Sequence, residues 1–429
     1  MENLLLMGID TRPMVNSALK LDYKTFSISY FKTLDFKMPY KEKHVLDQES
    51  VISCGRFEEN FSQEKLFELF DEILFENEDS SNENKNENDN DNDNDIDKIV
   101  LTTGLNASDF SGKFKKYQKI VRGNKNTEKV ENKFKFYKRL KNKFNVPLTF
   151  QPRDVYELNE ILQQHTNNQF ILKPLQGSGG LGIFLLNNES HNKNNNSNSL
   201  LQNIPYENYI LQGYVEGINV SSSVLSSHDS QKNLINTRLI TEHDLGKNSF
   251  EYSGNILPLD ENSIRMFNVN QTNFEKNNFN IEELNEEMKN TSEELIREFG
   301  LIGSNGIDYI LDKNGQLKII EINPRLQGTY EIVEKACGIN LLDAHIKACE
   351  GEVIDIPDAK QYSIKKIIYA KKQVNIGNLN IPNVYDIPYE GVKIEKDQPL
   401  VTIISSNKNL ENAIEDVKKA EDRVYENID

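Results

Sequence analysis

The sequence predicts an α/β protein (α+β overall) that is built from more than one domain. The chain has 429 residues. At about 100–200 residues per domain, that is too long for one compact unit. Strand-like and helix-like segments alternate near the N-terminus, which is typical of an open α/β layer. Further along, two apolar strand-like runs flank a glycine-rich turn, which indicates a hairpin in a second domain.

The first segment of the chain predicts a strand, a helix and a strand in turn. An apolar run at residues 4–8 ends in glycine, and Pro13 then suits the first turn of a helix. Residues 24–30 alternate polar and apolar side chains, as a half-buried strand does. A helix is expected at 63–75, and the apolar run at 99–104 predicts a buried parallel strand. One glycine at the first turn is not the G-x-G-x-x-G pattern, which argues against a dinucleotide-dependent dehydrogenase.

About half of the net negative charge lies in one segment, residues 76–97. The chain carries a formal net charge of −17, and this segment contributes ten acidic residues and one lysine. It has no apolar residue before Ile96, so it cannot bury enough surface to offset its conformational entropy. We therefore expect a disordered acidic insertion. An acidic chain without a basic stripe also argues against nucleic acid as a partner.

Several other classes of protein are disfavoured because their signals are missing from the sequence. No apolar run reaches the roughly 18 residues that a membrane span needs. The N-terminus lacks the features of a signal peptide. Cys54, Cys337 and Cys349 lie far apart and form no C-x-x-C pair, which fits a reducing compartment and argues against a disulfide framework. We therefore expect a cytoplasmic protein that binds no membrane.

From residue 127 onward, the hydrophobic patterns indicate helices and strands more clearly. Two helices have clear stops, one before Pro147 and one at Gly300. The sequence Lys-Asn-Gly at 313–315 favours a tight hairpin between two strands. In order, the expected elements are a helix at 131–144, strand pairs within 170–186 and 208–225, a helix at 281–299, strands at 306–312 and 316–324, helices from 329 and at 341–350, strands at 364–370 and 399–405, and a helix at 409–426.

The strongest single feature is the glycine-rich turn that follows Lys173. Its glycines let successive backbone N–H groups turn toward one anion, and Lys173 at the end of the incoming strand adds a point charge. It is not a Walker A loop, because no Lys-Ser/Thr pair follows and a strand comes next. The turn therefore predicts phosphate binding, and the alternative is a flexible turn beside a solvated lysine. The turn residues are Gly177, Ser178, Gly179, Gly180 and Gly182.

A second feature combines Asp308 with the sequence EINPR at 321–325. Strand alternation puts Glu321 and Asn323 on one face, and the predicted hairpin brings Asp308 to the neighbouring strand. Two carboxylates and an amide oxygen are hard ligands that suit an Mg²⁺ ion bridging nucleotide phosphates. Arg325, just past the strand, is suited to phosphate or carboxylate. The alternative is a half-buried sheet with a solvated acidic face.

Together, in this order, the two features resemble the ATP-grasp superfamily. Within it, the chain looks most like archaeal predicted ATP-dependent carboligases related to biotin carboxylase. The resemblance implies a Rossmann-like pre-ATP-grasp domain at 1–126 and an ATP-grasp domain at 127–351 with a hinge near 212–215. It also implies a small mixed α/β domain at 352–429.

The resemblance also implies roles for individual residues. Lys133 and Lys173 match the nucleotide-binding lysines, and the glycine turn matches the loop that covers the phosphates. Arg325 matches the arginine that steadies the transferred phosphate. Many members have an acid where this chain has Asn219, so the ribose contact differs here, and Gln212 replaces a frequent glutamate. The hinge residues that meet adenine are Gln212, Gly213, Tyr214 and Val215, and the metal ligands are Asp308, Glu321 and Asn323.

The function that the resemblance implies is that of an ATP-dependent ligase. ATP and Mg²⁺, with Mn²⁺ as an alternative ion, would serve to activate a small-molecule carboxylate as an acyl-phosphate for attack by an amine or similar nucleophile. The alternatives are a bicarbonate-activating carboxylase and an ATP-binding module without turnover. A homodimer is the default assembly. The second substrate is expected near Asp10, Arg12, Arg238 and Tyr252.

Overall fold

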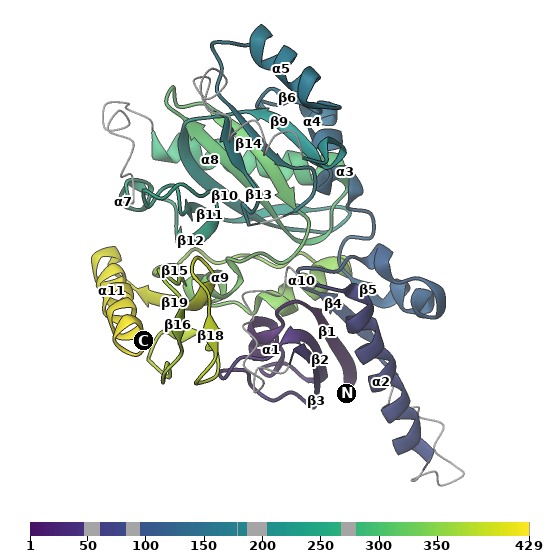
Figure 1. Cartoon of the computed structure of the whole chain (residues 1–429). Helices are drawn as coiled ribbons and strands as arrows, with labels where there is room; N and C mark the ends of the chain where they lie inside the picture. The colour runs from purple at the N-terminus through teal and green to yellow at the C-terminus, as the bar shows by residue number, and fades with distance from the viewer. Residues whose placement is uncertain (47–60, 83–94, 178, 187–203, 267–279, 429) are drawn as a thin grey trace.

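Three regions follow one another along the chain in the computed structural model (Figure 1). The N-terminal region lies at the bottom of the view, the central region at the top, and the C-terminal region beside the N-terminal one. Helices α9 (Tyr330–Cys337) and α10 (Leu341–Cys349) lie between the upper and lower regions. The structure describes residues 1–46, 61–82, 95–177, 179–186, 204–266 and 280–428.

The N-terminal region is a parallel sheet of strand order β3-β2-β1-β4-β5. Side chains of β1 alternate between its two faces, so Leu4 and Leu6 pack with α1 and α10, whereas Leu5 and Met7 pack with α2. The elements are β1 (Glu2–Gly8), α1 (Arg12–Ala18), β2 (Tyr23–Phe31), β3 (Lys41–Leu46), α2 (Gln63–Asn82), β4 (Lys98–Leu101), the 3₁₀ segments Ala107–Asp109 and Gly112–Ile120, and β5 (Val121–Arg122).

The prediction of a disordered insertion at 76–97 is wrong at both of its ends. Helix α2 continues to Asn82 and projects away from the body of the molecule (Figure 1). Residues 76–82 include only two glutamates among weaker helix formers, but adding turns to a helix already formed by residues 63–75 costs less than starting a new helix. At the other end, the backbone N–H of Asn3 donates to Asp97 at 2.7 Å and its side chain donates to the carbonyl of Asp95 at 2.7 Å. Residues 83–94 lie outside the described part of the chain.

The central region holds two antiparallel sheets. The smaller has the order β6-β9-β7-β8, and the larger begins β14-β13-β10-β11-β12. The glycine-rich turn joins β7 to its antiparallel neighbour β8, as the hairpin prediction requires. The elements are α3 (Glu128–Glu131), α4 (Lys133–Leu140), β6 (Thr149–Phe150), α5 (Val155–Gln164), β7 (Phe170–Pro174), β8 (Phe184–Leu186), the 3₁₀ segment Tyr206–Asn208, β9 (Tyr209–Gly213), β10 (Gly217–Ser226), β11 (Gln231–Thr241), β12 (Tyr252–Leu257), α7 (Glu261–Ile264), α8 (Ile281–Phe299), β13 (Gly303–Asp312) and β14 (Leu317–Asn323).

The larger sheet continues into the C-terminal region without a break, because β12 pairs with β15 and the order runs on as β15-β19-β17. The predicted boundary between residues 351 and 352 therefore divides a continuous sheet, and the domain limits stay a prediction. The elements are β15 (Tyr362–Tyr369), β16 (Val374–Asn375), β17 (Val384–Tyr385), β18 (Lys393–Ile394), β19 (Pro399–Asn407) and α11 (Leu410–Glu426).

The expected helix at 131–144 is in fact two helices, α3 and α4, that meet at Asn132. The side chain of Asn132 accepts a hydrogen bond from the backbone N–H of Lys135 at 2.9 Å and so caps α4. The sequence did not predict α5, β11 or β12, and the last two matter for the site described below. Among the described helices, none has the length and apolar character needed to cross a membrane.

Candidate functional site

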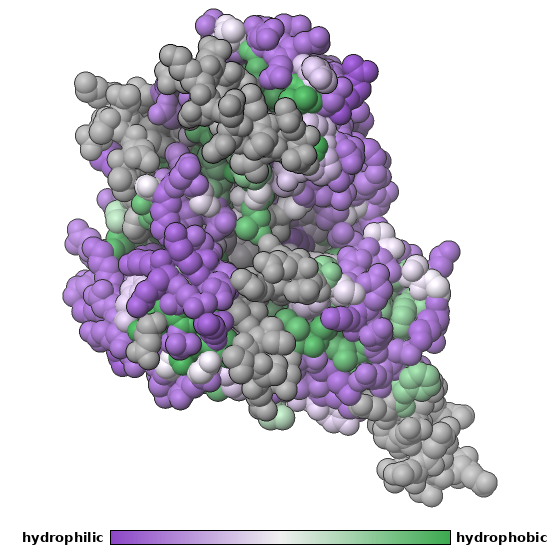
Figure 2. Space-filling model, in the orientation of Figure 1, coloured by the Kyte–Doolittle hydropathy of each residue, from purple (hydrophilic) through white to green (hydrophobic). Residues whose placement is uncertain are grey.

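A cavity of about 370 Å³ lies in the central region, with its walls formed by strands of both antiparallel sheets. The face of the molecule seen in Figure 2 is hollowed between its upper and lower parts, and hydrophobic residues show in this hollow. Most of the residues predicted from the sequence line the cavity, namely Lys133, Lys173, Gly177, Gly179, Gly180, Gln212, Gly213, Tyr214, Val215, Asn219, Asp308, Glu321, Asn323 and Arg325. Gly182 instead packs near Pro174, and Ser178 lies outside the described residues.

Two carboxylates face each other at one end of the cavity. Asp308 on β13 and Glu321 on β14 are directly opposed partners in the expected hairpin, and the register shifts just after Asp308. Asp308 accepts hydrogen bonds from the hydroxyl of Ser221 at 2.7 Å and from the amide of Asn323 at 2.9 Å. Burial and the charge of Glu321 raise the pKa of Asp308 to about 7, although these two hydrogen bonds oppose the rise. The pair therefore favours a cation between or beside its carboxylates.

Three basic side chains surround Glu321. The Nζ atom of Lys133 lies 3.7 Å from a carboxylate oxygen of Glu321, and Arg325 donates to Asn323 at 3.4 Å. Burial alone would raise the pKa of Glu321, but Lys133, Lys173 and Arg325 outweigh it and the pKa is lowered. Burial together with the charge of Lys133 lowers the pKa of Lys173 to about 8. A buried lysine with a lowered pKa gains from an anionic ligand that restores its charge.

The acidic end of the cavity fits a hard divalent cation. Among the described residues, no three side chains from His, Cys, Asp or Glu converge on one point. Asn323 offers the third ligand, but its amide nitrogen faces Asp308 here and its oxygen faces Arg325. The amide would have to turn over to complete a protein ligand set with Asp308 and Glu321. Magnesium suits such a set, because it keeps several waters and takes only one or two carboxylates from the protein.

The glycine turn lies folded over the cavity, against the segment before β12. The backbone N–H of Tyr252 donates to the carbonyl of Gly179 at 2.9 Å. Gly180 has φ +79°, and a Cβ atom there would lie 2.0 Å from the carbonyl oxygen of Phe250, so glycine is required. Lys133 donates from Nζ to the carbonyl of Gly177 at 2.9 Å. These contacts hold the turn close to the basic residues.

The aromatic end of the cavity is lined by the rings of Tyr214, His243 and Phe250. The rings of His243 and Phe250 stack with centroids 5.1 Å apart and an interplanar angle of 8°, and Tyr214 meets both edge-on. On the neighbouring sheet, Gln212 donates to the hydroxyl of Thr149 at 3.0 Å. Sequence reasoning missed His243 and Phe250, because they lie in the loop between the unpredicted strands β11 and β12.

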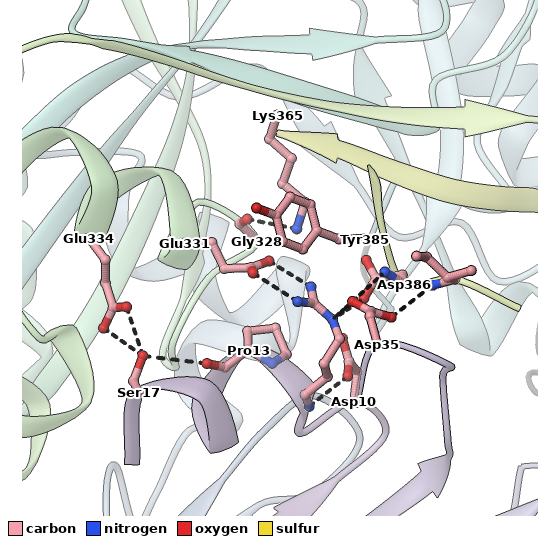
Figure 3. A network of polar contacts seen from close by, with 12 residues as sticks. Asp10, Pro13, Ser17, Asp35, Gly328, Glu331, Glu334, Lys365, Tyr385 and Asp386 are labelled. Atoms are coloured by element: carbon pink, nitrogen blue, oxygen red, sulfur yellow. Dashed lines mark hydrogen bonds and ion pairs between the residues drawn. The ribbon is translucent and has the colours of Figure 1, made fainter. Parts of the chain in front are cut away.

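Two residues expected near the second substrate, Asp10 and Arg12, do not line the cavity. The guanidinium of Arg12 is buried at the meeting point of the three regions and donates to Glu331 and to Asp386 (Figure 3). Asp10 accepts the backbone N–H of Arg12 at 2.9 Å. The charge of Arg12 is paired with Glu331 and Asp386, so we assign this arginine to holding the regions together.

The other two residues expected near the second substrate differ from each other. Arg238 is fully buried and donates to Asp244 at 2.9 Å, so its charge is paired inside the protein. Tyr252 lines the cavity close to the acid pair, and its hydroxyl donates to Asn255. Burial and the charge of Asp308 raise the pKa of Tyr252, so its phenol stays protonated.

Solved structures share this architecture. A biotin carboxylase from Campylobacter jejuni, solved with a β,γ-ATP ligand, superposes with a TM-score of 0.70 at 15% identity and covers 100% of this chain and 92% of its own. An N5-carboxyaminoimidazole ribonucleotide synthetase from Thermotoga maritima gives a TM-score of 0.61 at 13% identity over 98% of both chains. At these identities the similarity shows the fold, and it confirms the predicted likeness to biotin carboxylase.

Sequence comparison points to the same fold. An uncharacterized protein of Methanocaldococcus jannaschii is 30% identical over 439 residues, which cover 99% of this chain and 94% of the relative. A family model described as an ATP-grasp domain matches residues 130–329, the stretch that carries the glycine turn and the Asp308–Glu321 pair. The chain therefore belongs to the ATP-grasp family.

Proposed function

We propose that the protein is an ATP- and Mg²⁺-dependent ligase that activates a small carboxylate as an acyl-phosphate. One observation carries the proposal. The acid pair Asp308–Glu321 and the basic residues Lys133, Lys173 and Arg325 line a single cavity beneath the glycine turn. This arrangement suits a polyphosphate whose charge is shared between bases and a divalent cation.

Each end of the cavity has a role in this proposal. The adenine ring would lie against this aromatic group of Tyr214, His243 and Phe250, with the backbone of the hinge at 212–215 along its edge. The phosphates then extend toward Lys133 and Lys173. Asp308, Glu321 and Asn323 would hold Mg²⁺, which neutralises phosphate charge when it is bound, and Mn²⁺ is the alternative ion.

Phosphoryl transfer requires positioning and charge stabilisation more than a general base. A carboxylate oxygen of the substrate attacks the γ-phosphorus of ATP, the bond to the β,γ-bridging oxygen breaks, and ADP leaves. The nucleophile then attacks the acyl carbon and displaces phosphate. Arg325 stabilises charge on the transferred phosphoryl group. The glycine turn, held by Tyr252 and Lys133, excludes water that would hydrolyse the acyl-phosphate.

The second substrate has room on the side of the acid pair that faces the N-terminal region. There the cavity is lined by Tyr252, by the turn at 327–329 and by Thr103. Thr103 follows β4, at the carboxyl edge of the parallel sheet, where open α/β sheets bind ligands. We place the carboxylate and its nucleophile in this space.

A bicarbonate-activating carboxylase is the second candidate. The observation that favours it is the likeness to biotin carboxylase domains across the whole chain. One such domain, from the 2-oxoglutarate carboxylase of Hydrogenobacter thermophilus and solved with MgADP and bicarbonate, gives a TM-score of 0.68 and covers 98% of this chain and 89% of its own. Bicarbonate would then take the place of the organic carboxylate at the same phosphoryl-transfer site.

The test is a screen of the purified protein with Mg-ATP. Candidate carboxylates and amines are first ranked by the rise in melting temperature, since ligands that bind only the folded state stabilise it. Those that stabilise are then assayed for ADP release, with bicarbonate as a separate arm. ADP release that needs both a carboxylate and an amine supports the ligase, and release with bicarbonate alone supports the carboxylase. Tight ATP binding without turnover under any condition would support a binding module instead.

A further inference from the structure

The side-chain amide of Asn219 has a fixed orientation. Asn219 lies on β10, and its Nδ2 atom donates to Oδ2 of Asp244 at 3.1 Å. The nitrogen of the amide therefore faces Asp244, and the carbonyl oxygen faces away from it. Asn219 lines the cavity, and within the described ranges no hydrogen-bond donor reaches its Oδ1 atom.

Asp244 is itself held in place from several sides. Its side chain is only 4% exposed, and the guanidinium of Arg238, fully buried, donates to Oδ1 at 2.9 Å. The backbone N–H and the hydroxyl of Thr241 each donate to Oδ2 at 2.8 Å. Arg238 also donates to the backbone carbonyl of Asn219 at 2.7 Å. The carboxylate of Asp244 cannot turn without losing these bonds.

The position of Asn219 corresponds to the middle of a bound nucleotide. Alternation along β10 puts Asn219 and Ser221 on the same face, and Ser221 bonds to Asp308 of the acid pair. Asp244 directly follows His243 of the aromatic end. Asn219 therefore lies between the aromatic end, which suits the base, and the acid pair, which suits the metal and phosphates. The part of ATP between base and phosphates is the ribose.

We infer that Asp244 is a positioning residue that, together with Arg238, holds the carbonyl oxygen of Asn219 toward the cavity to accept a hydrogen bond from a ribose hydroxyl. The amide oxygen of Asn219 thus accepts the hydrogen bond that a carboxylate would otherwise accept. The site therefore selects ribonucleotides over deoxynucleotides. The inference rests on the proposed function, because it takes ATP as the nucleotide.

The experiment measures the affinity of the full chain for ATP, 2′-deoxy-ATP and 3′-deoxy-ATP by calorimetry in the presence of Mg²⁺. The wild-type protein binds at least one deoxy analogue about fivefold more weakly than ATP, the change expected for one lost hydrogen bond. Asn219→Leu binds all three nucleotides equally. Ser226→Ala, which removes a buried hydrogen bond to the Leu301 carbonyl from the far end of the same strand, keeps the wild-type preference.

The positioning role of Asp244 has its own variants. In Asp244→Asn the affinities for ATP and for the deoxy analogues become nearly equal, because the amide of Asn219 is then free to turn over. Asn219→Asp tests the same point without disturbing Arg238. A carboxylate at position 219 would face the carboxylate of Asp244, so this variant binds ATP at least about tenfold more weakly, despite offering a better acceptor.

Two results would overturn the inference and leave the proposed function standing. One is equal binding of ATP and both deoxy analogues by the wild-type protein. The other is Asn219→Asp binding ATP as tightly as wild type. Failure of the wild-type protein to bind ATP at all would overturn the proposed function as well, so the two failures are distinguishable.

Discussion

Arg12 donates two parallel hydrogen bonds to Glu331, from NH1 to Oε1 at 2.9 Å and from NH2 to Oε2 at 2.8 Å. Arg12 begins α1 in the N-terminal region and Glu331 lies in α9, next to the turn that lines the cavity. The Nε atom of Arg12 also donates to Asp386 of the C-terminal region at 2.6 Å (Figure 3). One buried guanidinium therefore joins all three regions of the chain.

Replacing Arg12 with methionine should lower the free energy of unfolding by about 3–5 kcal/mol, because Glu331 is then buried without its guanidinium partner and the half-buried Asp386 loses its ion pair with Arg12. Chemical denaturation followed by circular dichroism measures this. Lys20→Met is the matched control, since Lys20 is 66% exposed and its pair with Glu334 is 3.9 Å long. The control should change stability by less than about 1 kcal/mol. Equal effects of the two substitutions would refute a junction role for Arg12.

Closure of the glycine turn should depend on Gly180. Gly180→Ala puts a Cβ atom against the carbonyl of Phe250 and should lower the rate of ADP release by about tenfold or more, because the turn can no longer lie over the phosphates. Gly179→Ala is the control. Gly179 has a similar positive φ, +71°, but no atom lies within 4 Å of its added Cβ. If both variants lose the same activity, backbone strain rather than closure explains the loss.

Binding of ATP should be coupled to protonation of Lys173. Its pKa of about 8 in the free protein means that the amine is mostly neutral at pH 9, whereas bound phosphate favours the charged form. ATP binding should therefore take up a proton above pH 8, and affinity should fall as the pH rises through this range. Calorimetry in two buffers of different ionisation enthalpy measures the uptake. Lys173→Arg, which keeps its charge, should abolish the uptake, and persistence of the uptake in this variant would exclude Lys173 as its source.

Stability in mild acid should depend on His345. Its Nδ1 accepts the backbone N–H of Ser304 at 2.9 Å and its Nε2 lies 3.0 Å from the carbonyl of Arg122, so the ring is held neutral. Burial lowers its pKa from 6.5 to about 4. The unfolded chain then binds more protons than the folded protein between these two pH values. The neutral His345 therefore makes its whole contribution to the free energy of unfolding above about pH 6.5, and this contribution is lost as the pH falls toward 4.

Because of His345, the free energy of unfolding should fall by about 1 kcal/mol between pH 7 and pH 5.5. Urea denaturation at the two pH values measures it. His345→Gln should reduce the pH dependence, while His228→Gln, at an exposed position, should leave it unchanged. An identical pH dependence in wild type and His345→Gln would contradict this assignment.

The acid end of the site could be predicted because its signals are local. Asp308 and Glu321 lie on strands joined by a short turn, so alternation and the hairpin sequence suffice to bring them together. The glycine turn is equally local, since β7 and β8 are sequence neighbours that pair. In such segments, elementary strand geometry sets both which residues share a face and how far apart they are.

The aromatic end and the Asp244 cluster could not be predicted, because they depend on β11. This strand buries polar side chains that are satisfied by specific partners, such as Asn236, which accepts from Ser222 at 2.7 Å. Its hydrophobic alternation is therefore weak, and the loop that follows it carried no recognisable signal. For Arg12, the sequence carried a signal, but the signal was misleading. Its place after a strand suggested a ligand site, but its partners Glu331 and Asp386 lie more than 300 positions away.

The central claim is that Glu321 and Asp308 bind the metal that accompanies ATP. The most direct test measures the affinity for ATP with Mg²⁺ and with EDTA, in wild type, Glu321→Gln and the exposed control Glu286→Gln. We expect Mg²⁺ to strengthen ATP binding in wild type and in the control by at least about tenfold, and to have almost no effect in a folded Glu321→Gln protein. A Glu321→Gln variant that keeps the wild-type Mg²⁺ dependence would contradict the assignment.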